Sequence, residues 1–238
     1  MKKVTLTILI ILACVLMTEA ALADEKPRLG VLRFTNQTRA GWWGGGVGRD
    51  LQDMLINELA AINAFTLLER SELDAVLGEQ DLGASGRIDS ATRAKIGQLK
   101  GAQYLVAATV SSYEERTSGT GGGVRVGRMA IGGQRETAYI AIDLRIIDTT
   151  TGEIVDVRTI EAEADSSSVR GRAGVGQLSG NLSSQQRTPA GRAIRACLME
   201  IVDYLECSLV KGRDHRCMNE YTKKEEQRRE RTREGVRF

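Results

Sequence analysis

The sequence is poor in proline, in aromatic residues and in the residue that most often carries protons in enzymes. Its 238 residues include a single histidine, His215, two prolines and only 4% Phe, Trp and Tyr. A serine or cysteine nucleophile needs a histidine to shuttle its proton, and His215 lies in a charged segment near the C-terminus. The acidic residues Glu69, Asp143 and Asp148 lie where strand or helix ends place solvated or capping carboxylates. We therefore expect a protein that is not an enzyme.

The glycine-rich stretch GTGGGVRVGRMAIGG (residues 119–133) does not have the pattern of a phosphate-binding loop. It contains no GK[ST] and leads into a strand-like pattern, so backbone amides and a helix dipole would not converge on a phosphate. Basic residues are not interleaved with aromatic ones, which argues against nucleic-acid binding. The sequence predicts no cofactor, no catalytic site and no nucleic-acid partner.

Residues 1–23 have the layout of a secretory signal peptide. Two lysines precede an apolar run (residues 4–17), and the small-residue site ALA (residues 21–23) stands before Asp24. The run is shorter than the ~20 residues that cross a bilayer, so a retained anchor is the less favoured alternative. We expect cleavage after Ala23 and export to the outer-membrane-bounded periplasmic space or the outer membrane.

The segment ILAC (residues 11–14) also resembles a lipobox, in which Cys14 would be acylated. Cleavage before Cys14 would give a very short leader and leave part of the apolar run at the new N-terminus. We therefore favour cleavage after Ala23 and keep lipidation as the alternative.

The mature chain carries nearly balanced charge, because removal of residues 1–23 leaves 31 basic and 30 acidic residues. A general polyanion binder is not indicated. Residues 211–238 hold ten Lys or Arg against six Asp or Glu. We interpret them as a charged, solvated and partly helical tail, with a nucleic-acid or lipid-surface patch as the alternative.

Three cysteines remain after Ala23. In an oxidising compartment, a disulfide between Cys207 and Cys217 would attach the tail to the preceding helix, and Cys197 has the register of a core thiol. A metal site that includes His215 is the alternative, although ten-residue spacings fit no compact ligand pattern. We favour the disulfide and expect no metal.

The first part of the folded chain alternates short strands with helices. RLGVLRF (residues 28–34) has the length of a strand, and a Gly and Trp loop follows it. Apolar residues at three- and four-residue steps predict a helix from residue 47 to about residue 63. A short strand (65–68), a helix capped by Ser71 and a third helix from Asp89 or Ser90 to Gly101 follow.

From Tyr104 the apolar period changes from helical to two. Strands are predicted at residues 104–115, 137–148 and 153–164, with a turn at Thr151-Gly152. Pro189 then begins a long helix to about Leu209. Its predicted buried face comprises Ile194, Cys197, Leu198, Ile201, Val202 and Leu205.

The pattern predicts an α/β (α+β) fold over residues 24–210, with a mostly antiparallel sheet packed by helices in a three-layer-like domain. Trp42 and Trp43 are adjacent in a glycine-flanked loop. They are interpreted as a lid on the following helix, a contact with another subunit, or a binding or pore-lining patch.

The order of several segments resembles the CsgG/HfaB family, the curli production assembly and transport component and its relatives. The resemblance covers residues 28 to about 205. It is carried by LRFTNQT (32–38), LQDML (51–55), FTLLER (65–70), LGEQDLGASG (77–86), GAQYLV (101–106) and LRIIDTTTGE (144–153).

The resemblance implies a periplasmic domain with two β-hairpins, at roughly residues 111–142 and 161–187. In that family, several subunits join such hairpins into one outer-membrane barrel that exports unfolded curli subunits. The family's pore is narrowed by a loop after the first strand, and by position this loop carries Asn36, Trp42 and Trp43 here. The resemblance thus implies a homo-oligomer whose partners are secreted curli-like subunits or other envelope proteins.

Two hypotheses follow. The first is an oligomeric envelope protein that forms an outer-membrane secretion pore. The second is a soluble periplasmic interaction or scaffold module of the same fold without pore activity. The second is favoured by the absence of a lipidated N-terminal cysteine after cleavage at Ala23, and by Arg125 and Arg128 in the first hairpin, because a membrane-facing arginine costs about 2–4 kcal/mol at the bilayer midplane.

Overall fold

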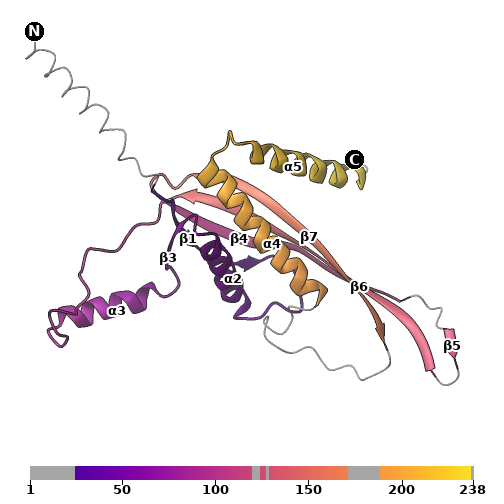
Figure 1. Ribbon diagram of the computed structural model, residues 1–238, viewed down its shortest axis with the longest axis horizontal. Coiled ribbons are helices and arrows are strands. Elements are labelled where there is room, and N and C mark those ends of the chain that lie inside the picture. The colour runs from indigo at the N-terminus through magenta and orange to yellow at the C-terminus, as the bar shows by residue number, and fades with distance from the viewer. Residues whose placement is uncertain (1–24, 120–123, 127–128, 171–187, 237–238) are drawn as a thin grey trace, which may run out of the picture.

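The computed structural model describes residues 25–119, 124–126, 129–170 and 188–236. Its strands form one mixed sheet, ordered β3-β1-β4-β6-β7, in which β2 also pairs with β4 and β5 with the far end of β6 (Figure 1). The strands are β1 (Arg28–Val31), β2 (Thr35–Asn36), β3 (Thr66–Leu68), β4 (Tyr104–Gly119), β5 (Val124–Val126), β6 (Met129–Asp148) and β7 (Ile154–Arg170).

The sheet contains both parallel and antiparallel ladders because the connections between its strands differ. The ladders β1–β3, β1–β4 and β2–β4 are short and parallel, because helical segments carry the chain back between those strands. The ladders β4–β6 and β6–β7 are long and antiparallel. The α/β class is confirmed, and the antiparallel ladders hold most of the paired residues, but the sheet is mixed.

A tight turn joins β6 to β7 at the predicted place. Gly152 has a φ of 75°, a conformation that glycine adopts without a steric penalty. The Asp148 carboxylate accepts hydrogen bonds from the amides of Thr150 (2.7 Å) and Thr151 (3.2 Å), and the amide of Gly152 donates to the Asp148 carbonyl (2.9 Å). These contacts fix the register of the two longest strands.

The core lies between the sheet and two helices on the same face, α2 (Val47–Ile62) and α4 (Pro189–Leu205). Arg195 and Glu58 join the two helices by an ion pair of 3.0 Å. All six apolar residues predicted to form the inner face of α4 are buried, including Cys197. Burial raises the pKa of the Cys197 thiol to about 12, so it is a core residue as predicted.

The opposite face of the sheet is partly open, because Arg145 and Val157 lie opposite each other on that face and both are exposed. In the part of the chain that the structure describes, α2 and α4 pack on one face, and α5 (Arg216–Glu234) lies along β7. Arg231 of α5 pairs with Glu161, which lies on the same face as Arg145. The predicted packing of the sheet by helices is confirmed.

The start of α2 is held against β1 by close backbone contact. The amide of Phe34 donates to the carbonyl of Gly48 (3.1 Å), and a Cβ at residue 48 would lie 2.4 Å from the Phe34 carbonyl oxygen. Only glycine fits there. One turn later, the buried Gln52 side chain donates to the carbonyl of Val31 (2.7 Å), so its polar amide is paired inside the core.

Helix α3 (Leu73–Ala84) forms as predicted but lies away from the core (Figure 1). Val76 and Leu77 on its predicted apolar face are 37% and 40% exposed. Its N-cap is Glu72 and not Ser71. Glu69 accepts from the amides of Ser71 (2.6 Å) and Glu72 (3.1 Å), and these bonds, that of Glu72 first, lower the pKa of Glu69.

The helix predicted from Asp89 or Ser90 to Gly101 is absent from this described segment. Asp89 does accept from the amide of Ala91 (3.0 Å), as a helix cap would, but the chain makes only turns afterwards. Ile96 and Leu99 are 65% and 47% exposed. Without a surface on which to bury an apolar face, a short helix gains too little packing energy to form.

Strands β4, β6 and β7 continue beyond the helices as a three-stranded extension, which we call the arm: residues 114–119 of β4, 132–139 of β6 and 163–170 of β7 (Figure 1). The first predicted hairpin, residues 111–142, contains the part of the β4–β6 ladder from Ser112 to Gly119. In the second, residues 161–187, β7 runs to Arg170 and residues 171–187 lie outside the described residues, as do the predicted signal peptide and Cys14. No described helix has the length and apolar character needed to cross a bilayer.

The C-terminal segment continues from α4 through a π-helical stretch, η3 (Glu206–Lys211), and a short loop into α5 (Arg216–Glu234). The predicted charged tail is therefore helical over most of its length. Tyr221 of α5 is only 8% exposed and packs on the core. The tail is thus docked on the domain near β7 rather than wholly solvated.

Candidate functional site

The loop between β2 and α2, residues 37–46, begins with a turn made by Asn36. The Asn36 carboxamide oxygen accepts from the amide (2.8 Å) and hydroxyl (2.7 Å) of Thr38, and its nitrogen donates to the Thr38 carbonyl (3.2 Å). The amide of Gln37 donates to the carbonyl of Val110 on β4 (2.9 Å). The polar side chain predicted to line a constriction is thus bonded within its own loop.

A β-bulge in β4 determines which side chain of this strand contacts the loop. The register shifts between Val110, which pairs with Ile142, and Ser112, which pairs with Ala141. Tyr113 therefore pairs with Ile140, a fully buried residue of the core face. If the same sequence paired without a bulge, Ser112 would lie opposite Ile140 and Tyr113 would point to the opposite face.

The two tryptophans of the loop pack on Tyr113. The Trp42 ring lies edge to face with Tyr113 (centroids 5.3 Å apart, 71°) and with Trp43 (5.6 Å, 61°). All three rings are half-buried and pack against the core. Burial, and then the charge of Glu115, raise the pKa of Tyr113, so its phenol stays neutral. Trp42 Nε1 is buried without a hydrogen-bond partner among the described residues. The rings form a fixed aromatic patch at the root of the arm.

The arm itself is polar on both faces within the part whose side chains are described. One face carries Glu114, Arg116, Thr137 and Glu163, which the cross-strand pairing places together. Arg116 and Glu114 form an ion pair of 2.8 Å, with side chains 80% and 53% exposed. The other face includes the exposed Glu115. Neither face therefore offers an unbroken apolar surface.

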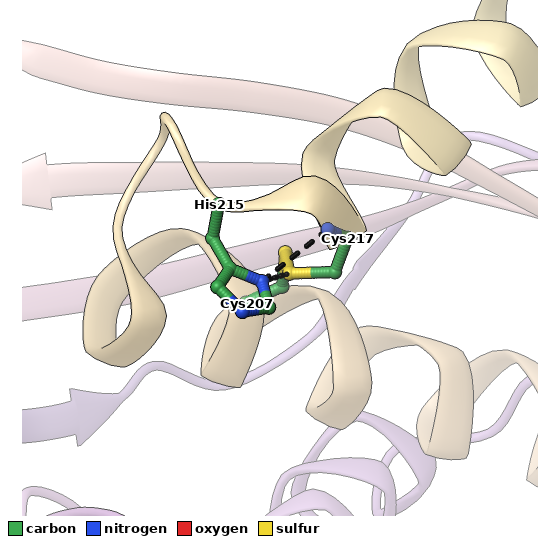
Figure 2. Close-up of side chains that lie close together, drawn as sticks. All are labelled: Cys207, His215 and Cys217. Carbon is green, nitrogen blue, oxygen red and sulfur yellow. Dashed lines mark hydrogen bonds between the residues drawn. A yellow bond between two sulfur atoms is a disulfide. The ribbon is translucent and has the colours of Figure 1, made fainter.

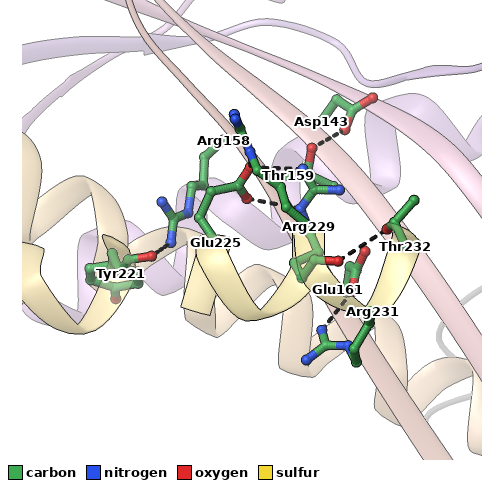
Figure 3. A network of polar contacts seen from close by, with 10 residues as sticks. Asp143, Arg158, Thr159, Glu161, Tyr221, Glu225, Arg229, Arg231 and Thr232 are labelled. Atoms are coloured by element: carbon green, nitrogen blue, oxygen red, sulfur yellow. Dashed lines mark hydrogen bonds and ion pairs between the residues drawn. The ribbon is translucent and has the colours of Figure 1, made fainter. Parts of the chain in front are cut away.

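Arg158 on β7 holds the C-terminal helix to the domain. Its guanidinium lies 5.3 Å from the Tyr204 ring centre and 5.4 Å from that of Tyr221, and it donates to the Tyr221 carbonyl (Figure 3). The two rings meet edge to face, 4.9 Å apart. Burial is the main cause of the raised pKa of both phenols. One cation between two aromatic faces thus links β7, α4 and α5.

Charged contacts continue along α5 (Figure 3). Glu225 accepts from Arg228 (2.8 Å) and Arg229 (2.7 Å). These bonds, that of Arg228 first, lower the pKa of Glu225 to about 2 against the opposing effect of burial. Arg231 forms an ion pair of 3.4 Å with Glu161 of β7. This network aligns α5 with β7.

The pair Cys207 and Cys217 forms a disulfide that joins η3 to the first turn of α5 (Figure 2). His215, the N-cap of α5, lies beside it, with its Nδ1 3.0 Å from the Cys217 sulfur. The sulfur and nitrogen atoms of the three residues lie within 4.8 Å of one another. The sequence offered a disulfide and a metal site as alternatives. The residues of both lie together in the structure.

A comparison with known protein families identifies the family of this chain. The family model described as "Curli production assembly/transport component CsgG" matches residues 13–236. The chain belongs to the CsgG family. The resemblance inferred from the sequence is confirmed, and the CsgG family is a transport and assembly component, not an enzyme. A comparison with curated proteins found no matching sequence.

Solved structures resemble this CsgG-family chain at a distance. A hypothetical protein from Chlamydia trachomatis has 14% identity and a TM-score of 0.46, over 79% of this chain and 99% of that one. A PelC dodecamer from Paraburkholderia phytofirmans has 11% identity and a TM-score of 0.32 (76% and 89%). The LpoB C-terminal domain from Salmonella enterica has 22% identity and a TM-score of 0.32 (61% and 88%). At these scores the likeness does not inform function.

Of the residues singled out from the CsgG resemblance, Trp42 and Trp43 lie together and Asn36 forms the turn that opens their loop. Tyr113 and Arg158 were missed. In β4, the apolar residues Val106, Ala108 and Val110 are two residues apart, but the next apolar side chain, Tyr113, follows after three. This shift by one residue was the signal for Tyr113. The role of Arg158 depends on contacts with distant rings, which leave no local pattern.

Proposed function

We propose that this chain is a non-enzymatic, self-associating component of the cell envelope that acts as an assembly module in curli-type transport, with its arm in water. The observation that supports this proposal is the charge on both faces of the arm. Glu114 and Arg116 lie on one face and Glu115 on the other. Membership of the CsgG family supports the link to assembly and transport.

Lipid around this part of the arm is disfavoured by the free energy of placing charged side chains in a bilayer. A strand in a membrane barrel alternates apolar residues toward lipid with polar residues toward the lumen. A charged basic side chain on the lipid face costs about 2–4 kcal/mol at the midplane, and an acidic one less. Because both faces carry charges, neither orientation of the strands removes this cost. The described arm is better suited to water or to a protein partner.

Self-association is favoured by the edges of the arm. In the described residues, no further strand pairs with the outer edge of β4 beyond Tyr113 or with that of β7, although α5 lies along β7 as far as Glu161. Strand edges without a partner strand present backbone donors and acceptors that invite another strand. If the β4 edge of one copy joins the β7 edge of the next within the arm, the contact is head-to-tail, and it forms a ring when the rotation between copies closes. The proposed partners are copies of this chain and secreted subunits or other envelope proteins.

A second candidate function is an outer-membrane channel that exports unfolded curli-like subunits. It is favoured by the family membership and by the aromatic patch at the root of the arm. In this proposal Trp42 and Trp43, with Asn36, line a constriction of the oligomer.

Fractionation and conductance separate the two functions. The assembly module should be released with periplasmic contents or washed from membranes by salt, and purified protein should give no conductance in planar bilayers. Stable, stepwise conductance would instead establish the channel. Trp42→Ala with Trp43→Ala should enlarge that conductance if the loop is a constriction, and Trp43→Phe provides the matched conservative control.

A further inference from the structure

The residues at the junction of η3 and α5 present three donor atoms of the kinds that bind soft and borderline metal ions. Cys207 is buried, Cys217 half-buried and His215 exposed, and their donor atoms lie within 4.8 Å of one another. The Cα atoms of the two cysteines are 6.2 Å apart. Two thiolates and an imidazole with one side open to solvent match the protein ligands of an open, four-coordinate zinc site.

The histidine is oriented for such a role. Its Nδ1 accepts a hydrogen bond from the amide of Cys217 (3.3 Å) and lies 3.0 Å from the sulfur of the same residue (Figure 2). A ring nitrogen that accepts a hydrogen bond carries a lone pair, and metal binding uses the same lone pair. The imidazole is therefore held with its donor atom facing the sulfur.

The position of Cys217 favours a thiolate after the disulfide opens. It is the second residue of a 19-residue helix. Free amides and the positive end of the helix dipole at this position stabilise a negative charge. The thiolate is the form of cysteine that binds metals.

Contacts other than the disulfide keep the three residues together. Tyr221 anchors α5 through its ring contact with Tyr204 and through Arg158. The loop between η3 and α5 is held by Arg213, which pairs with Asp156 (3.8 Å) and donates to the Val155 carbonyl. On the η3 side, the Ser208 hydroxyl donates to the same Asp156 carboxylate (2.7 Å). Reduction therefore removes one covalent link but leaves the framework.

From this geometry we propose that Cys207, His215 and Cys217, once reduced, bind a zinc ion, and that the disulfide is the closed form of this site. A dithiol reductant supplies two electrons and two protons. The S–S bond breaks, each sulfur becomes a thiol, and the reductant becomes a disulfide. Zn²⁺ then replaces the two thiol protons, which pass to solvent, and a water completes the coordination.

The required movement is small. Zinc–sulfur distances of about 2.3 Å and zinc–nitrogen distances of about 2.0–2.1 Å in a tetrahedron place sulfur and nitrogen about 3.5 Å apart. The observed separation of His215 Nδ1 from the Cys217 sulfur is 3.0 Å. The two sulfurs must separate further, and breaking their bond allows this. The site does not depend on the function proposed above.

Calorimetry on the mature chain tests the proposal. The protein is reduced with dithiothreitol, desalted without oxygen and titrated with Zn²⁺, and the air-oxidised chain serves as its own control. The reduced chain should bind one equivalent of Zn²⁺ tightly and release protons, whereas the oxidised chain should show no comparable binding. Equal zinc binding by the two forms, or none by the reduced form, overturns the proposal.

Two variants assign the ligands. His215→Ala should still form the disulfide in air. When reduced, it should lose more than the roughly 10–100-fold in zinc affinity that is typical when a residue that only hydrogen-bonds to a metal ligand is replaced. Cys197→Ser should bind zinc as the unchanged chain does, because Cys197 is buried in the core. Unchanged affinity in His215→Ala, or lost affinity in Cys197→Ser, would contradict the assignment. Circular dichroism of each reduced variant checks that the total helix content is retained.

Discussion

The Trp42 ring meets the Tyr113 ring edge to face, with centroids 5.3 Å apart, and this contact joins two parts of the fold that are 71 residues apart in the sequence. Trp42 comes from the loop before α2, and Tyr113 from β4 just after the bulge. The pair therefore fixes the loop at the place where the core ends and the arm begins.

Replacing Tyr113 by alanine should destabilise the fold. The change removes a half-buried ring and its contact with Trp42, and we expect a loss of about 1–3 kcal/mol in the free energy of unfolding. Urea unfolding followed by tryptophan fluorescence measures it. Tyr113→Phe keeps the ring and should lose much less, so similar losses in the two variants would refute the importance of the ring contact.

An insertion next to Tyr113 should be more damaging than deletion of Ser111. Ser111 is the unpaired residue of the bulge, so its deletion leaves Ser112 opposite Ala141 and Tyr113 opposite Ile140, on the core face. One serine inserted between Ser112 and Tyr113 lies opposite Ile140 instead and turns Tyr113 to the other face. We expect the insertion to lower the melting temperature by several degrees or more and to expose Trp42 to quenchers. An insertion variant as stable as the deletion variant would show that the position of Tyr113 is dispensable.

Arg158→Met should loosen α5 without unfolding the core. The change removes the cation between Tyr204 and Tyr221 and the bond to the Tyr221 carbonyl. We expect α5 docking to weaken by about 1–3 kcal/mol. Hydrogen exchange should rise in α5 and stay unchanged in α2. Arg116→Met, an exposed arginine of β4 that pairs with Glu114, is the control. Equal protection of α5 in both variants would contradict this role of Arg158.

Acid should loosen α5 through Glu225. The pKa of Glu225 falls from 4.5 to about 2 in the folded protein because Arg228 and Arg229 of the same helix donate to it, so its ionised form favours the helical state of α5. This contribution is present above about pH 4.5 and is lost as the pH falls toward 2. The protection factors of α5 amides, which are corrected for the pH dependence of intrinsic exchange, should therefore fall several-fold in this range, and Glu225→Gln should remove the pH dependence. Glu234→Gln, in the same helix, should leave it unchanged. A persisting acid step in Glu225→Gln would assign it to another group.

The sequence allowed correct prediction of elements whose signal is local. The inner face of α4 and the turn at Gly152 follow from spacing and backbone preference, and both are confirmed. The predicted helix after Asp89 was wrong because Ile96 and Leu99 have no surface to pack on. The bulge before Tyr113 and the role of Arg158 depend on contacts between distant segments, which period and composition do not encode.

The most direct test of the account is the mass of the mature chain in detergent-free buffer, measured by analytical ultracentrifugation. The charged arm and its free strand edges predict a defined oligomer in water, whose mass stays constant over a tenfold dilution. A monomer at every concentration in water, with association only after detergent or lipid is added, would contradict the assembly module and support the membrane channel.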